Sequence, residues 1–272
     1  TVREPVPRSA VLPLGTVEFE GRRLPAPADP ERLLEASYGP DWRIPNPTFS
    51  YRPDPELKAR FDPWFGNLMR QRRAWEGTFR RQQGWRPSPF ARSVRRALDP
   101  DVVVVDVGCG RGADALFFAR GGRRSIGLDY ARPGLRLGAR RARGRDLSAR
   151  FEPVNLYDLR DSLTAAALLR RTDGPYAVDA RGLLDALAPD GRENFWRLAR
   201  GLLAPGGTAH LEFGGTEPDS VPVRFPVSAS EVAAEAARFG GRVVFAGQLT
   251  DGTDEHPGVC RMRVEWGGET RD

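Results

Sequence analysis

The chain has 272 residues, enough for one large domain or two small ones with a core that needs no disulfide or metal. Its two cysteines lie far apart, and the two cysteines and two histidines lack metal-ligand spacing, which argues against a disulfide scaffold and a zinc site. No apolar run is long enough to span a membrane, and no segment resembles a secretory signal. We therefore expect a cytoplasmic protein without a metal ion.

The formal net charge is +6, and all but one of the 42 basic residues are arginines. Basic residues are densest in 70–96 and 120–150. A basic surface is compatible with a nucleic-acid partner. Abundant Arg, Ala, Gly and Pro throughout the chain indicate a compositional bias instead. We interpret both stretches as solvated surface and expect no nucleic acid as partner.

Residues 1–85 form the first predicted region. Eleven of the 24 prolines lie in 1–55, which predicts a loop-rich arm with short strand-like pieces at 11–12 and 16–19. From Pro55, apolar residues recur at steps of three and four, which predicts an amphipathic helix, or a kinked pair, with Gly84 as a stop. This stripe is typical of a core rather than of a binding site. It contains Leu57, Phe61, Trp64, Phe65, Leu68, Trp75 and Phe79.

Residues 86–272 form the second predicted region, in which strand and helix patterns alternate. The apolar run 102–105 is typical of a strand that is buried on both faces of a parallel sheet. Alternation of this kind predicts a doubly wound α/β domain. Further strands are expected at 125–128, 151–154, 176–179, 208–213, 242–246 and 260–266. Helices are expected after Pro89, at 113–120, after Pro133, at 163–170, from Asp190 with Glu193, and from Ser228 with Glu231.

The first long strand runs into a glycine-rich turn, Asp106-Val107-Gly108-Cys109-Gly110-Arg111-Gly112. Gly108 allows a sharp turn, Gly110 lets a ligand approach the backbone, and Gly112 allows close helix packing. An acid ahead of the glycines disfavours a pyrophosphate and suits a cationic amino group. A glycine-rich turn by itself is a weak signal.

The next strand ends in Asp129, about 20 residues beyond the glycine turn. A carboxylate at this position can accept two hydrogen bonds from a ribose diol. The ligand that these residues imply has a ribose and a positively charged amine but no pyrophosphate. S-adenosylmethionine fits this description better than NAD does.

Three motifs together resemble class I S-adenosylmethionine-dependent methyltransferases: the glycine turn from Asp106, Gly127-Leu128-Asp129-Tyr130, and Pro205-Gly206-Gly207. The resemblance covers about residues 86–267 and implies a Rossmann-like, seven-stranded doubly wound sheet. It implies that the turn, with Asp106, Gly108, Cys109 and Gly110, holds the methionine end of the cofactor. It places Asp129 on the ribose hydroxyls and Tyr130 beside the adenosine.

The resemblance also suggests roles after the next two strands. Asn155 would meet the exocyclic amine of adenine, and the Leu156 N–H would meet the ring. The alternative is that Asn155 satisfies its own loop backbone. Arg181 resembles an arginine of methyltransferases that act on small or cell-surface molecules, and we place it in the cofactor site. Asp185 is a candidate general base, or it only pairs with Arg181 or Arg192.

A second, shorter resemblance concerns the arm. Phe19-Glu20-Gly21, the stretch from Pro25 to Pro30, and Tyr38-Gly39-Pro40-Asp41-Trp42 with the residues to Pro47 are similar to the tail of LicD/fukutin-related phosphotransferases. Those enzymes act on phosphorylated sugars and surface glycans. The resemblance implies a glycan, sugar or phosphate-bearing acceptor. An arm that only packs on the catalytic domain remains the alternative.

Together these features predict a methyltransferase domain at 86–272 and an arm with a helical cover region at 1–85. The predicted activity is S-adenosylmethionine-dependent O- or N-methylation of a small molecule, sugar or glycan, as in natural-product or glycan modification. Two alternatives stay open: an RNA methyltransferase that uses the arginine-rich surface, and a cofactor-binding scaffold without turnover.

Overall fold

The computed structural model describes residues 6–45, 55–81, 85–170, 174–214, 224–248 and 258–267, with the backbone alone for 55–67. By backbone packing the chain divides into two compact units, Thr1–Arg60 and Phe61–Asp272. The long helix α3 (Pro55–Arg81) crosses this division. The division lies N-terminal to the functional boundary predicted between residues 85 and 86, which stays a prediction.

The first unit is more regular than the loop-rich arm that the prolines predict. Asp29 explains the helix α2 (Pro30–Tyr38), because its side chain accepts the Arg32 N–H at 3.0 Å and Pro30 occupies the first turn. The strand expected at 16–19 is confirmed within β1, whereas the strand expected at 11–12 is wrong because Val11 ends a short helix. The other elements are α1 (Arg8–Val11) and the antiparallel hairpin of β1 (Gly15–Phe19) and β2 (Arg22–Ala26).

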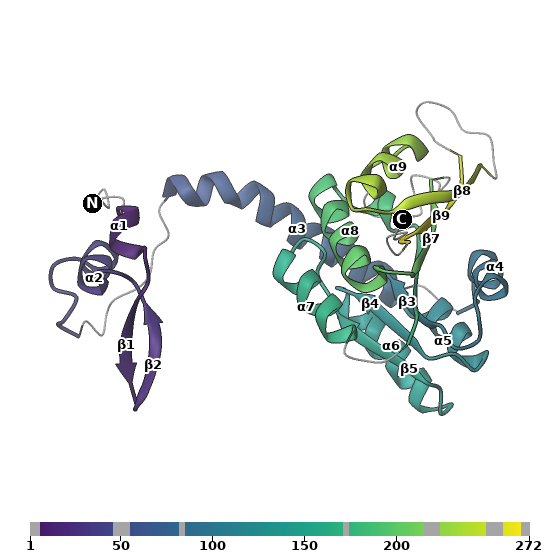
Figure 1. Cartoon of the computed structure of the whole chain (residues 1–272), viewed down its shortest axis with the longest axis horizontal. Coiled ribbons are helices and arrows are strands. Elements are labelled where there is room, and N and C mark those ends of the chain that lie inside the picture. The colour runs from purple at the N-terminus through teal and green to yellow at the C-terminus, as the bar shows by residue number, and fades with distance from the viewer. Residues whose placement is uncertain are drawn as a thin grey trace, which may run out of the picture. The chain divides into compact units, whose positions relative to one another are not determined.

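The second unit contains a mostly parallel, seven-stranded sheet with the order β5-β4-β3-β6-β7-β9-β8. Most of its strands are labelled in Figure 1. The first five strands in this order run parallel, and β9 is antiparallel to both β7 and β8. This confirms the predicted doubly wound sheet. The strands are β3 (Val103–Val107), β4 (Ser125–Asp129), β5 (Ala149–Pro153), β6 (Tyr176–Arg181), β7 (Thr208–Phe213), β8 (Arg242–Gln248) and β9 (Cys260–Glu265).

The valine run of β3 is buried on both faces, because helices cover each side of the sheet. Val105 belongs to the same core as Phe195 and Trp196, which lie on one side of the sheet. Val104 packs with Phe118 on the other side. The helices are α4 (Pro89–Ala97), α5 (Ala113–Arg120), α6 (Arg132–Arg143), α7 (Leu159–Leu169), α8 (Pro189–Leu203) and α9 (Ala229–Arg238), with a short 3₁₀ turn at Leu184–Ala186.

Capping groups set the helix starts. The capping box at Ser228 is confirmed: Ser228 Oγ accepts the Glu231 N–H at 3.2 Å, and Glu231 accepts the Ser228 N–H at 2.8 Å. Helix α7 begins four residues earlier than expected, because Asp158 accepts two backbone N–H groups of its first turn. The start expected at Asp190 is wrong by one residue, since Pro189 opens α8. The stop expected at Gly84 lies outside the described residues. No helix in the described part of the chain is long and apolar enough to cross a membrane.

Candidate functional site

The glycine turn connects β3 to α5 at the carboxyl end of the sheet. Gly108, Gly110 and Gly112 all have left-handed backbone angles, with φ of 75°, 54° and 74°. The Gly108 and Cys109 N–H groups donate to the Leu128 carbonyl at 2.8 and 3.0 Å, which ties the turn to the end of β4. A Cβ on Gly110 would lie 2.9 Å from a ring carbon of Phe79. The chain therefore needs glycines to form this turn.

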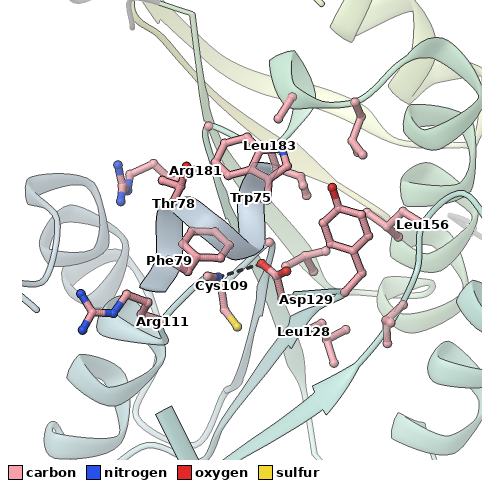
Figure 2. A pocket seen from close by; sticks show the side chains of 18 of the residues that line it. Trp75, Thr78, Phe79, Cys109, Arg111, Leu128, Asp129, Leu156, Arg181 and Leu183 are labelled. Carbon is pink, nitrogen blue, oxygen red and sulfur yellow. Dashed lines mark hydrogen bonds between the residues drawn. The ribbon is translucent and has the colours of Figure 1, made fainter. Parts of the chain in front are cut away.

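Asp129 lies at the end of β4 and braces the same turn (Figure 2). Its Oδ2 accepts the Gly110 N–H at 2.9 Å, and its Oδ1 accepts the Ala131 N–H at 2.7 Å. The residue is only 8% exposed, and this burial raises the pKa of its carboxyl to about 6, although the backbone hydrogen bonds act in the opposite direction. A carboxylate has about four acceptor sites, so each oxygen retains capacity for a ligand hydroxyl.

A cavity of about 660 Å³ opens at these two features (Figure 2). Eight of the ten predicted site residues line it, and the structure brings them together from the ends of β3, β4, β5 and β6. They are Gly108, Cys109, Gly110, Asp129, Tyr130, Asn155, Leu156 and Arg181. Asp106 and Asp185 are not among the lining residues.

Helix α3 belongs to the region that was expected to cover the site, and it contributes a wall of the cavity whose individual residues the sequence did not single out. Trp75, Thr78 and Phe79 line the cavity, and the rings of Trp75 and Phe79 stack with centroids 5.6 Å apart. Figure 2 shows both rings above the glycine turn. The helical period predicted an apolar stripe, and this part of the stripe lines the cavity. Nothing in the period itself distinguishes a cavity wall from a core.

The loop after β5 is held in place by its own polar groups. Asn155 Oδ1 accepts the Tyr157 N–H at 3.1 Å, and the Asn155 N–H donates to Asp161 at 2.8 Å. The Leu156 carbonyl accepts the side-chain amide of Asn194 at 2.8 Å. Asn155 therefore satisfies its loop backbone and also faces the cavity. Its amide oxygen has a second lone pair that a ligand amine can use.

Asp106 lies in β3 directly beside Asp179 of β6, since the two residues are register partners. Asp106 accepts the Ala115 N–H at 3.1 Å. Asp179 is fully buried, and neither of its carboxylate oxygens has a hydrogen-bond partner in the described part of the chain. Burial, and then the charges of Asp106 and Asp114, raise the pKa of Asp179 well above its ordinary value. The pair lies outside the cavity lining, so a direct contact of Asp106 with a ligand is not part of this geometry.

Asp185 is 2% exposed and forms an ion pair with Arg224, at 2.8 Å from Nη1 to Oδ2. It also accepts the Gly214 N–H at 3.2 Å. Burial raises the pKa of its carboxyl, and the Arg224 charge opposes this shift. Arg224 lines the cavity, whereas sequence reasoning missed it. Residues 185 and 224 are far apart in the sequence and no local pattern connects them, so only the tertiary structure brings this ion pair together.

The two pairings that were expected for Asp185 are both wrong. Arg181 instead pairs with Asp114, at 3.3 Å from Nε to Oδ2. Arg192 pairs with Glu235 at 2.9 Å.

No protein-family model matches the sequence, and no curated protein is detectably similar to it. Solved structures do match. One, described as converting a disulfide bond into a thioacetal group during echinomycin biosynthesis, has a TM-score of 0.54 and 21% identity over 76% of this chain and 94% of its own. A TehB-like SAM-dependent methyltransferase from Corynebacterium glutamicum has a TM-score of 0.51 and 16% identity over 78% and 100%.

A third similar structure is the 1,6-didemethyltoxoflavin-N1-methyltransferase of Burkholderia thailandensis, which contains bound S-adenosylhomocysteine. Its TM-score is 0.50, with 17% identity over 82% of this chain and 94% of its own. At this level of identity the similarity establishes the architecture. The chain therefore has the α/β, Rossmann-like fold of the class I S-adenosylmethionine-dependent methyltransferases.

Proposed function

We propose that the chain is an S-adenosylmethionine-dependent methyltransferase that acts on a small molecule, sugar or glycan-type acceptor. One observation carries the proposal: Asp129, at the carboxyl end of β4, faces the same cavity as the glycine turn after β3. In a doubly wound sheet, ligands bind at this edge, where the strand order reverses.

The residues present fit the cofactor. Asp129 would hold the ribose hydroxyls, because both of its oxygens retain acceptor sites beside their backbone partners. The turn from Gly108 to Gly110 would hold the methionine end, and Tyr130 with the loop at Asn155 and Leu156 would surround the adenosine. A cavity of about 660 Å³ lies within the usual range for small-molecule and cofactor sites.

Asp106 would act differently from the expected direct contact. It lies outside the cavity lining and accepts an N–H of the first turn of α5. We therefore propose that Asp106 positions the turn, and that Arg181, which lines the cavity, meets the cofactor at its charged end.

When bound, the cofactor supplies a methyl group that is already activated on a sulfonium. Trp75, Phe79 and Leu183 line the cavity and would exclude water from the reacting atoms. Asp129 would fix the position of the cofactor along the sheet edge. Binding in a fixed orientation can supply most of the rate enhancement for such a transfer.

Asp185, the candidate base, pairs with Arg224 and accepts the Gly214 N–H, and it is not among the residues that line the cavity. We therefore assign it a structural role: it positions Arg224, which itself lines the cavity. Catalysis is then assigned to proximity and orientation, and a nucleophile that needs little help in losing a proton suits this site best.

A transfer assay tests the proposal and separates the acceptor classes. The protein is incubated with S-adenosylmethionine carrying a labelled methyl group and with cell extract divided into small-molecule, glycan and RNA fractions. We expect label in the small-molecule or glycan fraction. Label in RNA alone would support the RNA methyltransferase instead, and tight cofactor binding with no labelled fraction would support a scaffold.

A further inference from the structure

Three arginines converge on one indole ring at the surface of the second unit. The guanidinium carbons of Arg120, Arg141 and Arg145 lie 5.3, 5.7 and 5.2 Å from the ring centroid of Trp85. We call these four residues the Trp85 cluster. Its members come from the two stretches in which basic residues are densest, 70–96 and 120–150, which the fold brings together. These arginines are therefore not dispersed over the surface.

The cluster lacks negative charge of its own. Within the described ranges, no ion pair connects Arg120, Arg141 or Arg145 to a carboxylate, and Nη1 of Arg141 is buried without a hydrogen-bond partner. Burial lowers the pKa of Arg141, and the neighbouring charges of Arg111, Arg145 and Arg140 lower it further. Three guanidinium groups around one ring repel one another, so a bound anion would stabilise the Trp85 cluster.

Helix ends explain only part of the charge. Arg120 and Arg141 lie in the last turns of α5 and α6, where a cation interacts favourably with the helix dipole. Each such interaction contributes about 0.3–1 kcal/mol at an exposed position. It explains why arginines lie at these helix ends, but it does not explain why three of them meet at one ring.

The cluster borders the cavity, because Trp85 also lines it together with Arg86 and Arg111. Guanidinium groups bind phosphate oxygens in a bidentate fashion, and aromatic contact with the indole fixes their planes. We infer that the Trp85 cluster binds a phosphate-bearing group at the rim of the cavity. Because the cluster borders the cavity, we assign this phosphate-bearing group to the methyl acceptor, an assignment that rests on the proposed function.

Pyrophosphate is the probe. Its binding to the full chain is measured by titration calorimetry at low salt, for the parent and for the double variant Arg120→Gln/Arg145→Gln. Both arginines are exposed, so the variant should fold. The matched control is Arg200→Gln/Arg238→Gln, two exposed arginines on α8 and α9. Binding of S-adenosylhomocysteine is measured in parallel on all three proteins.

We expect pyrophosphate to bind the parent at a single site, with an affinity that falls as salt is added. Loss of one charge-assisted contact weakens binding about tenfold, so Arg120→Gln/Arg145→Gln should bind at least tenfold more weakly. The control should match the parent, and all three proteins should bind S-adenosylhomocysteine equally. The inference is overturned if the parent does not bind pyrophosphate or if both double variants lose affinity equally.

A second probe separates a small phosphate-bearing ligand from RNA. An oligouridylate of about ten nucleotides is titrated into the same proteins. Weak binding comparable with that of pyrophosphate supports a small ligand. Binding about a hundredfold tighter than pyrophosphate, and lost in Arg120→Gln/Arg145→Gln, would identify RNA as the ligand and overturn the inference. Failure of S-adenosylhomocysteine to bind, with pyrophosphate binding intact, would refute the proposed function and leave the anion site standing.

Discussion

Replacing Asp129 by alanine should separate cofactor binding from folding. The proposed contact with the ribose gives two hydrogen bonds to a charged group, and each contributes about 1.5–3 kcal/mol. Asp129→Ala should therefore weaken S-adenosylhomocysteine binding by about 3 kcal/mol or more, which is about a hundredfold in Kd. Titration calorimetry measures this change directly. Asp129→Asn keeps the shape and one acceptor oxygen, so its loss of affinity should be smaller.

The same substitution affects the turn itself. The Gly110 and Ala131 N–H groups lose their acceptors at 2.9 and 2.7 Å. Each buried N–H group left without an acceptor lowers the stability by about 1–3 kcal/mol. Part of this loss is offset, because the variant no longer buries a carboxylate, whose raised pKa shows that its burial is unfavourable. Thermal unfolding of Asp129→Ala should therefore show a modest loss of stability.

Glu231→Ala is the matched control for Asp129→Ala. Glu231 also accepts a backbone N–H, that of Ser228 at 2.8 Å, but it lies at the start of α9 and does not line the cavity. Its removal should lower stability by about 1 kcal/mol and leave S-adenosylhomocysteine affinity unchanged. If Asp129→Ala binds S-adenosylhomocysteine as the parent does, the assignment of the ribose site is wrong.

Three further predictions concern the same site. Gly110→Ala places a Cβ 2.9 Å from Phe79 at a φ of 54°, so S-adenosylhomocysteine titration should show affinity reduced about tenfold or more. The pKa of Asp129 is about 6, so the carboxylate that accepts hydroxyl protons exists above pH 6. Affinity should therefore fall as the pH is lowered through 6, and the parallel titration of Asp129→Asn should show no such step. Asp185→Ala removes the carboxylate that pairs with the half-buried Arg224, so unfolding should show about 2 kcal/mol lost, while S-adenosylhomocysteine affinity stays within about threefold.

Each of these predictions has an outcome that contradicts it. For Gly110→Ala the control is Gly122→Ala, where φ is 85° and no atom lies within 4 Å of the added Cβ, so only backbone strain is tested. If Gly110→Ala and Gly122→Ala lose cofactor affinity equally, backbone strain is responsible, and the contact of the new Cβ with Phe79 is not. A flat pH profile for the parent would refute the role of the Asp129 carboxylate. Retained stability with abolished methyl transfer in Asp185→Ala would restore Asp185 as a candidate base.

The glycine turn and Asp129 could be predicted because their signals are local. Left-handed backbone angles at Gly108 and Gly110 require glycine, and the spacing to the end of the next strand is set by a single helix and two turns. Each buried strand and each amphipathic helix likewise has its own local hydrophobic period, so each can be predicted without knowledge of the others. This explains why the sheet and most helix positions agree with the structure.

The remaining features depend on tertiary packing. The Arg224–Asp185 pair joins residues 39 positions apart. The Trp85 cluster joins the ends of two helices, α5 and α6, to Trp85 and Arg145, which lie outside the helices, and no local pattern relates Trp85 to these arginines. In the first unit, the many prolines predicted a loop, and the helix start that the Asp29 cap signals was not recognised. Proline at the first turn of a helix is compatible with that helix, and this is the case at Pro30.

The central claim is that the cavity at the end of β3 and β4 binds S-adenosylmethionine and not a dinucleotide. Titration calorimetry of the parent protein with S-adenosylhomocysteine and, separately, with NAD tests it most directly. The account predicts a single site for S-adenosylhomocysteine and no measurable heat of binding for NAD. Binding of NAD without binding of S-adenosylhomocysteine would contradict it.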